Sequence, residues 1–95
     1  MAAFIIVNVF INDQEAFERY KQLTPATVAA YGGRFIVRGG AVTPLEGNWD
    51  TGRLVVLEFP DKATAEAWWH SPEYAIAKSI RQQAASSDMV LVEGY

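Results

Sequence analysis

Two arginines four residues apart, Arg34 and Arg38, are the side chains of this sequence best suited to binding a small anion. A guanidinium group pairs with a carboxylate through two parallel hydrogen bonds. Gly39 and Gly40 follow directly, and residues without a side chain let a ligand approach the backbone closely. We therefore predict that Arg38 contacts an anionic ligand.

Glu58 is the carboxylate that strand alternation places nearest Arg34, with Asn8 facing it from the next strand. We expect these three side chains to form one polar cluster. A carboxylic acid in an apolar cavity holds its proton more readily, so Glu58 could protonate a substrate that Arg34 positions. The alternative is an ion pair that sets strand register or dimer geometry without catalysis, and the sequence leaves both roles open.

His70 is the only histidine, and imidazole is the side chain that exchanges a proton most readily near neutral pH. It precedes a helix restart at Ser71, so its ring can instead help to end a helix, and we favour that structural role. Glu58 and His70 are nevertheless the catalytic candidates. The predicted ligand-binding residues are Asn8, Arg34, Arg38, Glu58, His70 and Tyr74.

The composition excludes several classes of function. There is no cysteine, which rules out disulfides and thiolate catalysis, and a lone histidine lacks metal-ligand spacing, so we expect no metal and no other cofactor. A net charge of −3 with scattered basic residues argues against nucleic acid. The apolar start lacks a positively charged segment and is short, so we expect no membrane partner and a soluble, cytoplasmic protein of bacterial type.

Alternating apolar residues and helical spacing predict strands and helices in one domain over residues 1–95. The first helix should begin with a capping box formed by Asn12 and Glu15. It should kink or restart near Pro25 and end at Gly32 or Gly33 in a left-handed conformation. The expected elements are strand 4–11, helix 12–31, strand 34–37, strand 53–59, helices 61–69 and 71–84, and strand 89–92.

This order of strands and helices predicts an α+β, ferredoxin-like βαββαβ fold, with strands 4–11 and 53–59 in the centre of an antiparallel-type sheet. Alternation assigns one face to the helices: Ile5, Val7, Val9, Phe35, Val37, Val55, Leu57, Phe59, Val90 and Val92. The other face mixes apolar and charged residues: Ile6, Asn8, Phe10, Arg34, Ile36, Arg38, Leu54, Val56, Glu58, Met89, Leu91 and Glu93.

The mixed face is too apolar for water and too polar for an ordinary core, so we expect two subunits to pair their sheets around a partly polar cavity. Trp49, in the long connection 41–52, is a predicted dimer contact because aromatic residues are enriched at interfaces. Adjacent helical residues point about 100° apart. If Trp68 enters the core, Trp69 therefore lies at the cavity rim or in the dimer interface.

Several segments together resemble domain of unknown function family 1330, within the dimeric α/β-barrel superfamily. They are 31–40 (YGGRFIVRGG), 45–49 (LEGNW), 54–61 (LVVLEFPD), 67–69 (AWW), 71–74 (SPEY), Arg81 and 92–94 (VEG). Here Asn48 stands where an aspartate is common and Trp69 where a tyrosine is common. The resemblance implies a ferredoxin-like protomer whose sheets associate face to face. Some members of the superfamily are cofactor-independent oxygenases, haem-handling enzymes or isomerases.

Two functional hypotheses follow. The first is a cofactor-independent enzyme or binder of a small anionic or aromatic organic molecule, acting as a homodimer. The second is a non-catalytic dimeric module in which the polar residues of the sheet face satisfy one another. A ligand-sized cavity containing Arg38 would favour the first, and a closed ion-pair network the second.

Overall fold

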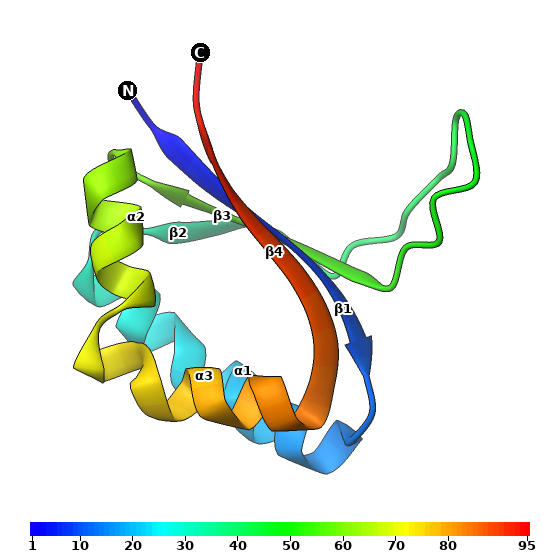
Figure 1. Ribbon diagram of the computed structural model, residues 1–95, viewed down its shortest axis with the longest axis horizontal. Helices are drawn as coiled ribbons and strands as arrows, with labels where there is room; N and C mark the ends of the chain where they lie inside the picture. The colour runs from blue at the N-terminus through cyan, green and yellow to red at the C-terminus, as the bar shows by residue number, and fades with distance from the viewer.

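The computed structural model describes residues 1–95 and has a ferredoxin-like α+β fold (Figure 1). One face of a curved sheet carries the three helices, and the two chain ends lie near each other. No helix is long and apolar enough to cross a membrane. The elements are β1 (Ala3–Ile11), α1 (Gln14–Ala30), β2 (Arg34–Arg38), β3 (Arg53–Phe59), α2 (Lys62–Trp69), α3 (Pro72–Ala84) and β4 (Ala85–Glu93).

The sheet is antiparallel throughout, with the strand order β2-β3-β1-β4. The predicted topology is therefore confirmed, with β1 and β3 in the centre. On β1 the alternation is also as predicted, because Ile5, Val7 and Val9 are buried beneath the helices. The largest buried side chains of this core are Trp68, Tyr74, Phe17, Phe59 and Val28.

The first helix differs from the prediction at its start and at Pro25. Asp13, and not Asn12, is the N-cap, and its carboxylate accepts a hydrogen bond from the Ala16 N–H at 3.1 Å. The helix continues past Pro25 without a restart. It ends as predicted, with Gly32 at a φ of +71° and its N–H bonded to the Ala29 carbonyl, a conformation that a side chain would strain.

The two shorter helices begin where the sequence predicts. The Asp61 carboxylate accepts a hydrogen bond from the Thr64 N–H at 2.7 Å and caps α2. The Ser71 hydroxyl accepts one from the Tyr74 N–H at 3.1 Å and caps α3, whose first turn contains Pro72. These caps satisfy backbone N–H groups that have no partner inside the helix.

The last strand is longer than predicted, and its predicted facing is wrong. Met89 pairs with Val7 and Leu91 with Ile5, so Met89 and Leu91 point beneath the helices. Val90 and Val92 are instead 57% and 46% exposed on the open face. Residues 89–92 are all apolar, so alternation alone could not distinguish the two faces.

A β-bulge at Ile36 reverses the facing of the end of β2. The paired residues are Arg34 with Glu58, Phe35 with Leu57, Val37 with Val56 and Arg38 with Val55. One extra residue shifts the alternation by one position. Arg34 stays on the open face, whereas Arg38 turns towards the helices and Val37 away from them. The prediction that both arginines share the open face is therefore wrong.

Candidate functional site

The polar cluster predicted on the open face is an ion pair of two residues. Arg34 donates from Nε to Glu58 Oε1 at 2.6 Å, as the sequence predicted. Asn8 does not join them, because it pairs with Leu54 along the strands, and its side-chain oxygen accepts a hydrogen bond from the Gly52 N–H at 2.8 Å. The interactions of Asn8 and Glu58 are thus made within the chain.

His70 and Tyr74 do not share a site. His70 ends α2 through its backbone N–H, bonded to the Glu66 carbonyl at 3.1 Å, and its side chain is exposed. His70 therefore lies at the end of the helix as predicted, but the prediction that its ring nitrogens end the helix is wrong. Tyr74 is fully buried and stacks on Trp68 with ring centroids 4.0 Å apart. Glu58 lies on the open face of the sheet, whereas His70 ends α2 on the helix-covered face.

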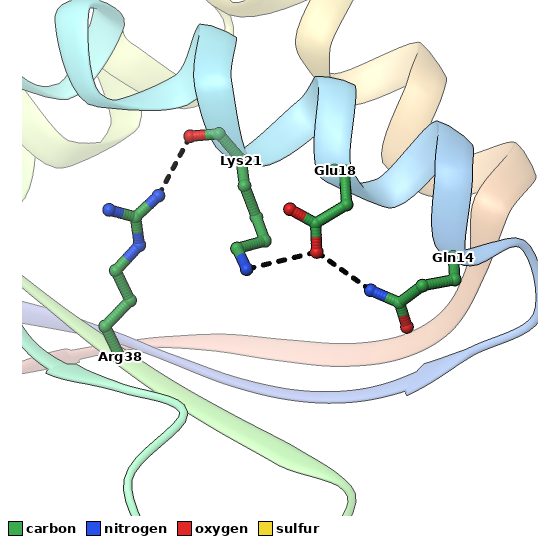
Figure 2. Close-up of polar contacts among 4 residues, drawn as sticks. All are labelled: Gln14, Glu18, Lys21 and Arg38. Carbon is green, nitrogen blue, oxygen red and sulfur yellow. Dashed lines mark hydrogen bonds and ion pairs between the residues drawn. The ribbon is translucent and has the colours of Figure 1, made fainter.

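Arg38 is held against α1 by a consequence of Pro25. Proline has no N–H, so the carbonyl four residues earlier, that of Lys21, lacks its usual helical partner. Arg38 Nη2 donates to this oxygen at 2.9 Å, and its guanidinium lies 4.4 Å from the centre of the Phe35 ring. Figure 2 shows Arg38 reaching across from the sheet to α1. Arg38 therefore has a structural partner that the sequence did not suggest.

The same close-up shows the carboxylate beside this contact. Lys21 Nζ and Gln14 Nε2 both donate to Glu18 Oε1, at 3.3 and 2.9 Å (Figure 2). These two hydrogen bonds lower the pKa of Glu18, that of Lys21 being the larger cause. Glu18 is exposed at the mouth between α1 and the sheet, where it pairs with Lys21, and the charge of Arg53 also contributes to lowering its pKa.

A small, partly open cavity of 30 Å³ lies between the helices and the sheet, and four basic residues line it. They are Lys21, Arg38, Arg53 and Arg81. The chain has only eight lysines and arginines, and no aspartate or glutamate lines this cavity. Half of the basic side chains of an acidic protein thus line one cavity, which we call the basic cavity. Arg81 is buried, Lys21 and Arg53 are half-buried, and Arg38 is exposed.

Arg53 is the least satisfied residue of the basic cavity. Its Nε is buried without a hydrogen-bond partner, and no carboxylate lies within ion-pair distance. Its guanidinium lies 5.9 Å from the centre of the Phe17 ring and against Gly39, where a Cβ would overlap it. The space at Gly39 is therefore occupied by the Arg53 guanidinium, whereas a Cβ at Gly40 would meet nothing within 4 Å.

Arg81 begins a chain of hydrogen bonds that leads into the basic cavity. The residue is 4% exposed, and its Nε donates to Tyr74 Oη at 3.3 Å. Tyr74 Oη lies 2.8 Å from Tyr20 Oη. Burial raises the pKa of Tyr74, outweighing the opposite effect of Arg81, so the phenol keeps its proton. With Tyr74 donating to Tyr20, the Tyr20 proton remains free for a group in the cavity.

Two larger cavities of 340 and 330 Å³ lie side by side along β4, beneath α2 and α3. Trp69 and Met89 line both of them. The first is almost wholly apolar, whereas the second contains Arg81 and Ser87, whose Oγ is buried without a partner. We call the two cavities together the outer groove. Each has the size of a small organic ligand site.

The predicted interface tryptophans lie in different surroundings. Trp68 is buried, and Trp69 lies at the rim of the outer groove, on the helix-covered side of the sheet, with Lys78 Nζ 4.4 Å from its ring centre. Trp49 is 66% exposed on the arm formed by residues 39–52, which contains neither helix nor strand and extends away from the sheet (Figure 1). No three histidine, aspartate or glutamate side chains are grouped to hold a metal ion.

Sequence reasoning missed Arg53 and Arg81, although signals for both were present. Arg53 is an even number of residues away from Val55, Leu57 and Phe59, so strand alternation assigns it to the helix-covered face. Arg81 lies seven residues after Tyr74 and four after Ala77, on the buried face of α3. Both were overlooked because charged residues at such positions usually lie in water.

Comparison with known proteins agrees with this fold. A family model described as "Domain of unknown function (DUF1330)" matches residues 2–95. No curated protein matches the sequence. RPA0582, a protein of unknown function from Rhodopseudomonas palustris, is similar with a TM-score of 0.79 and 18% identity over 99% of this chain and 82% of its own.

Two further solved structures are similar over almost the whole chain. A protein from Jannaschia sp. CCS1, described as dimeric, ferredoxin-like and of unknown function, has a TM-score of 0.73 and 17% identity over 99% of this chain and 100% of its own. SnoaB, a cofactor-independent oxygenase from Streptomyces nogalater, has a TM-score of 0.64 and 14% identity over 99% and 93%. At these identities the likeness extends to the fold alone. Because the family match spans nearly the whole sequence, this protein belongs to the domain of unknown function family DUF1330.

Proposed function

We propose that this protein binds a small organic carboxylate, with the carboxylate in the basic cavity. The observation that carries this proposal is that four of the eight basic residues line one cavity without an acidic residue among its walls, and that only Lys21 among them has an ion-pair partner.

The cost of burying these groups supports an external anion. Arginine stays charged at all physiological pH values, and moving a cation out of water costs several kcal/mol unless an opposite charge compensates it. Arg81 is almost fully buried and has no carboxylate partner, and Arg53 Nε has no partner at all. A ligand carboxylate would supply the missing charge and acceptor atoms.

The size of the basic cavity agrees with a carboxylate head group. To hold one water molecule, a cavity needs about 10–15 Å³ of space that the centre of the molecule can occupy. The 30 Å³ found here therefore accommodates roughly two water-sized groups, such as the two oxygens of a carboxylate. The Tyr20 hydroxyl, which can donate to a ligand when Tyr74 donates to it, also lines the cavity beside the cations.

The proposal concerns binding and does not assign a reaction. Glu58 and His70, the catalytic candidates, do not line the basic cavity. SnoaB shares the fold and is a cofactor-independent oxygenase, but one fold hosts many chemistries. An enzymatic role would use the Tyr20 phenol as a hydrogen-bond donor, with Tyr74 behind it, because the retained proton on Tyr74 prevents Tyr74 from acting as a base at neutral pH.

The binding test is a thermal-shift series with acetate, benzoate and the neutral analogue benzamide, at constant ionic strength. Ligands that bind only the folded state raise its stability, by about 2.7 kcal/mol at a concentration 100 times Kd. We expect benzoate to raise the melting temperature and benzamide not to do so. The benzoate shift should vanish in Arg53→Met and persist in Arg19→Met, which removes the same charge from an exposed position on α1.

We also propose that the open sheet face pairs with a second copy of the chain. Phe10, Ile36, Val37, Val90 and Val92 are exposed there by 40–57%, an apolar surface that water does not favour. The non-catalytic module is the second candidate function, and the Arg34–Glu58 pair on this face favours it. The exposed Trp49 supports a role for the arm in the same contact.

Light scattering after size-exclusion chromatography tests the dimer. We expect wild type to have twice the chain mass and Val90→Glu to be monomeric, with Ile76→Glu, an exposed apolar residue on α3, as the matched control that leaves the dimer intact. A monomeric wild type would refute the pairing. A dimer that no carboxylate stabilises would leave the non-catalytic module as the function.

A further inference from the structure

Met89 is the one residue that lines the basic cavity and both parts of the outer groove. It projects from β4 opposite Val7, beneath the helices, and is partly buried. The Met89 side chain therefore borders both the basic cavity and the outer groove, and Arg81 borders the basic cavity and the second part of the groove.

The two sides of Met89 differ in size and in chemistry. On its inner side the 30 Å³ basic cavity has room only for a head group. On its outer side the cavity of 340 Å³ is lined mainly by apolar residues, among them Ile5, Leu91 and the Trp69 ring. A molecule with a carboxylate at one end and an apolar body at the other would match both sides at once.

Methionine is suited to acting as a movable partition. Its side chain is unbranched, has three rotatable bonds and adapts to different neighbours, so it can change rotamer at low cost. Arg81 lines the basic cavity and the 330 Å³ part of the groove, so an anion could keep one cationic partner while it passes Met89. The unpartnered Ser87 hydroxyl lies in the same part of the groove.

From this arrangement we infer that Met89 is a specificity-determining gate, and that the ligand is an elongated carboxylate with an aromatic or apolar body. The carboxylate lies between Arg53 and Arg81 behind Met89, and the body lies in the outer groove against Trp69. This inference rests on the proposed carboxylate site and adds the length and polarity of its ligand.

Calorimetric titration with acetate, benzoate and 3-phenylpropanoate tests the gate in four proteins: wild type, Met89→Ala, Met89→Ile and Leu91→Ala. Fixing a flexible side chain costs binding free energy equivalent to roughly two- to tenfold in affinity. Met89→Ala should therefore bind 3-phenylpropanoate roughly two- to tenfold more tightly than wild type. Its acetate affinity should stay within roughly twofold.

The other two variants provide opposite controls. Isoleucine is stiff at its first side-chain torsion, so Met89→Ile should weaken 3-phenylpropanoate and leave acetate unchanged. Leu91→Ala shortens a residue of the same strand face that lines only one part of the groove, and it should not strengthen 3-phenylpropanoate. If Met89→Ala does not fold, Met89→Ile decides the question.

The outcomes separate the gate from the site it guards. Equal ratios of 3-phenylpropanoate to acetate affinity in wild type and both Met89 variants would overturn the gate, while acetate binding that depends on Arg53 would still support the carboxylate site. Absence of binding by all three acids would overturn both.

Discussion

Replacing Arg53 with methionine is expected to stabilise the fold while it removes the proposed anion site. Arg53 Nε is buried without a partner, and an unsatisfied buried group of this kind costs about 1–3 kcal/mol. Methionine keeps an apolar stem of similar length against Phe17 and has no group to satisfy. The variant loses a cation–π contact at 5.9 Å, worth about 0.5–1 kcal/mol.

The difference between these effects predicts a gain of about 1 kcal/mol in the free energy of unfolding. For a chain of this size, that corresponds to a rise of about 4–8 °C in the melting temperature. Arg34→Met is the matched comparison, because it removes an arginine that has a partner. Arg34 and Glu58 are 71% and 26% exposed, so solvent screens the pair and its loss should cost only about 0.2–1 kcal/mol.

Urea and thermal denaturation of the two variants therefore test the sign of each effect. Arg53→Met should unfold later than wild type, and Arg34→Met earlier. A loss of more than about 1 kcal/mol in Arg53→Met, the usual size of one hydrogen bond, would show that Arg53 holds the fold together. Arg53 would then be a structural residue and not a group that awaits an external anion.

Three further predictions follow from individual contacts. Arg38→Ala should lower the free energy of unfolding by about 1 kcal/mol in wild type but by little in Pro25→Ala, where the restored N–H of residue 25 donates to the Lys21 carbonyl. Urea denaturation of wild type, the two single variants and the double variant measures this coupling. Because burial raises the pKa of Tyr74 in the folded state, its contribution to stability should be complete below about pH 10 and decline above it. Urea titrations between pH 8 and pH 11 (about one unit beyond the free tyrosine value) should show a smaller alkaline decline in Tyr74→Phe. The hydrogen bonds from Thr64 lower the pKa of Asp61, so the contribution of Asp61 to folding stability should be present above about pH 4 and disappear as the pH falls through its folded-state pKa. Thermal melts of Asp61→Asn should lack this decline in stability at acid pH.

Much of the fold could be predicted because local signals agree with it. The Asp61 and Ser71 caps, the glycine end of α1 and the strand order all follow from residue types at fixed spacing. The Arg34–Glu58 pair also follows, because it precedes the bulge and depends only on regular antiparallel pairing.

The site could not be predicted to the same extent, for a physical reason. One extra residue at Ile36 moves Arg38 to the opposite face, and no residue type in 34–38 announces a bulge. The link from Pro25 to Arg38 joins residues that are distant in sequence through a carbonyl that only the folded helix leaves free. Strand alternation could have assigned Arg53 to the helix-covered face, but the absence of a hydrogen-bond partner for its Nε depends on how the interior packs.

The central claim, that the basic cavity binds a small carboxylate, is tested most directly by NMR of the arginine Nε–Hε groups during titration with benzoate. The chain has five arginines, two of which, Arg19 and Arg34, lie outside the cavity. We predict saturable shifts at Arg53 and Arg81 with one common Kd, and no saturable shift at Arg19 or Arg34. Equal, non-saturating shifts at all five arginines, or none at Arg53 and Arg81, would contradict the account.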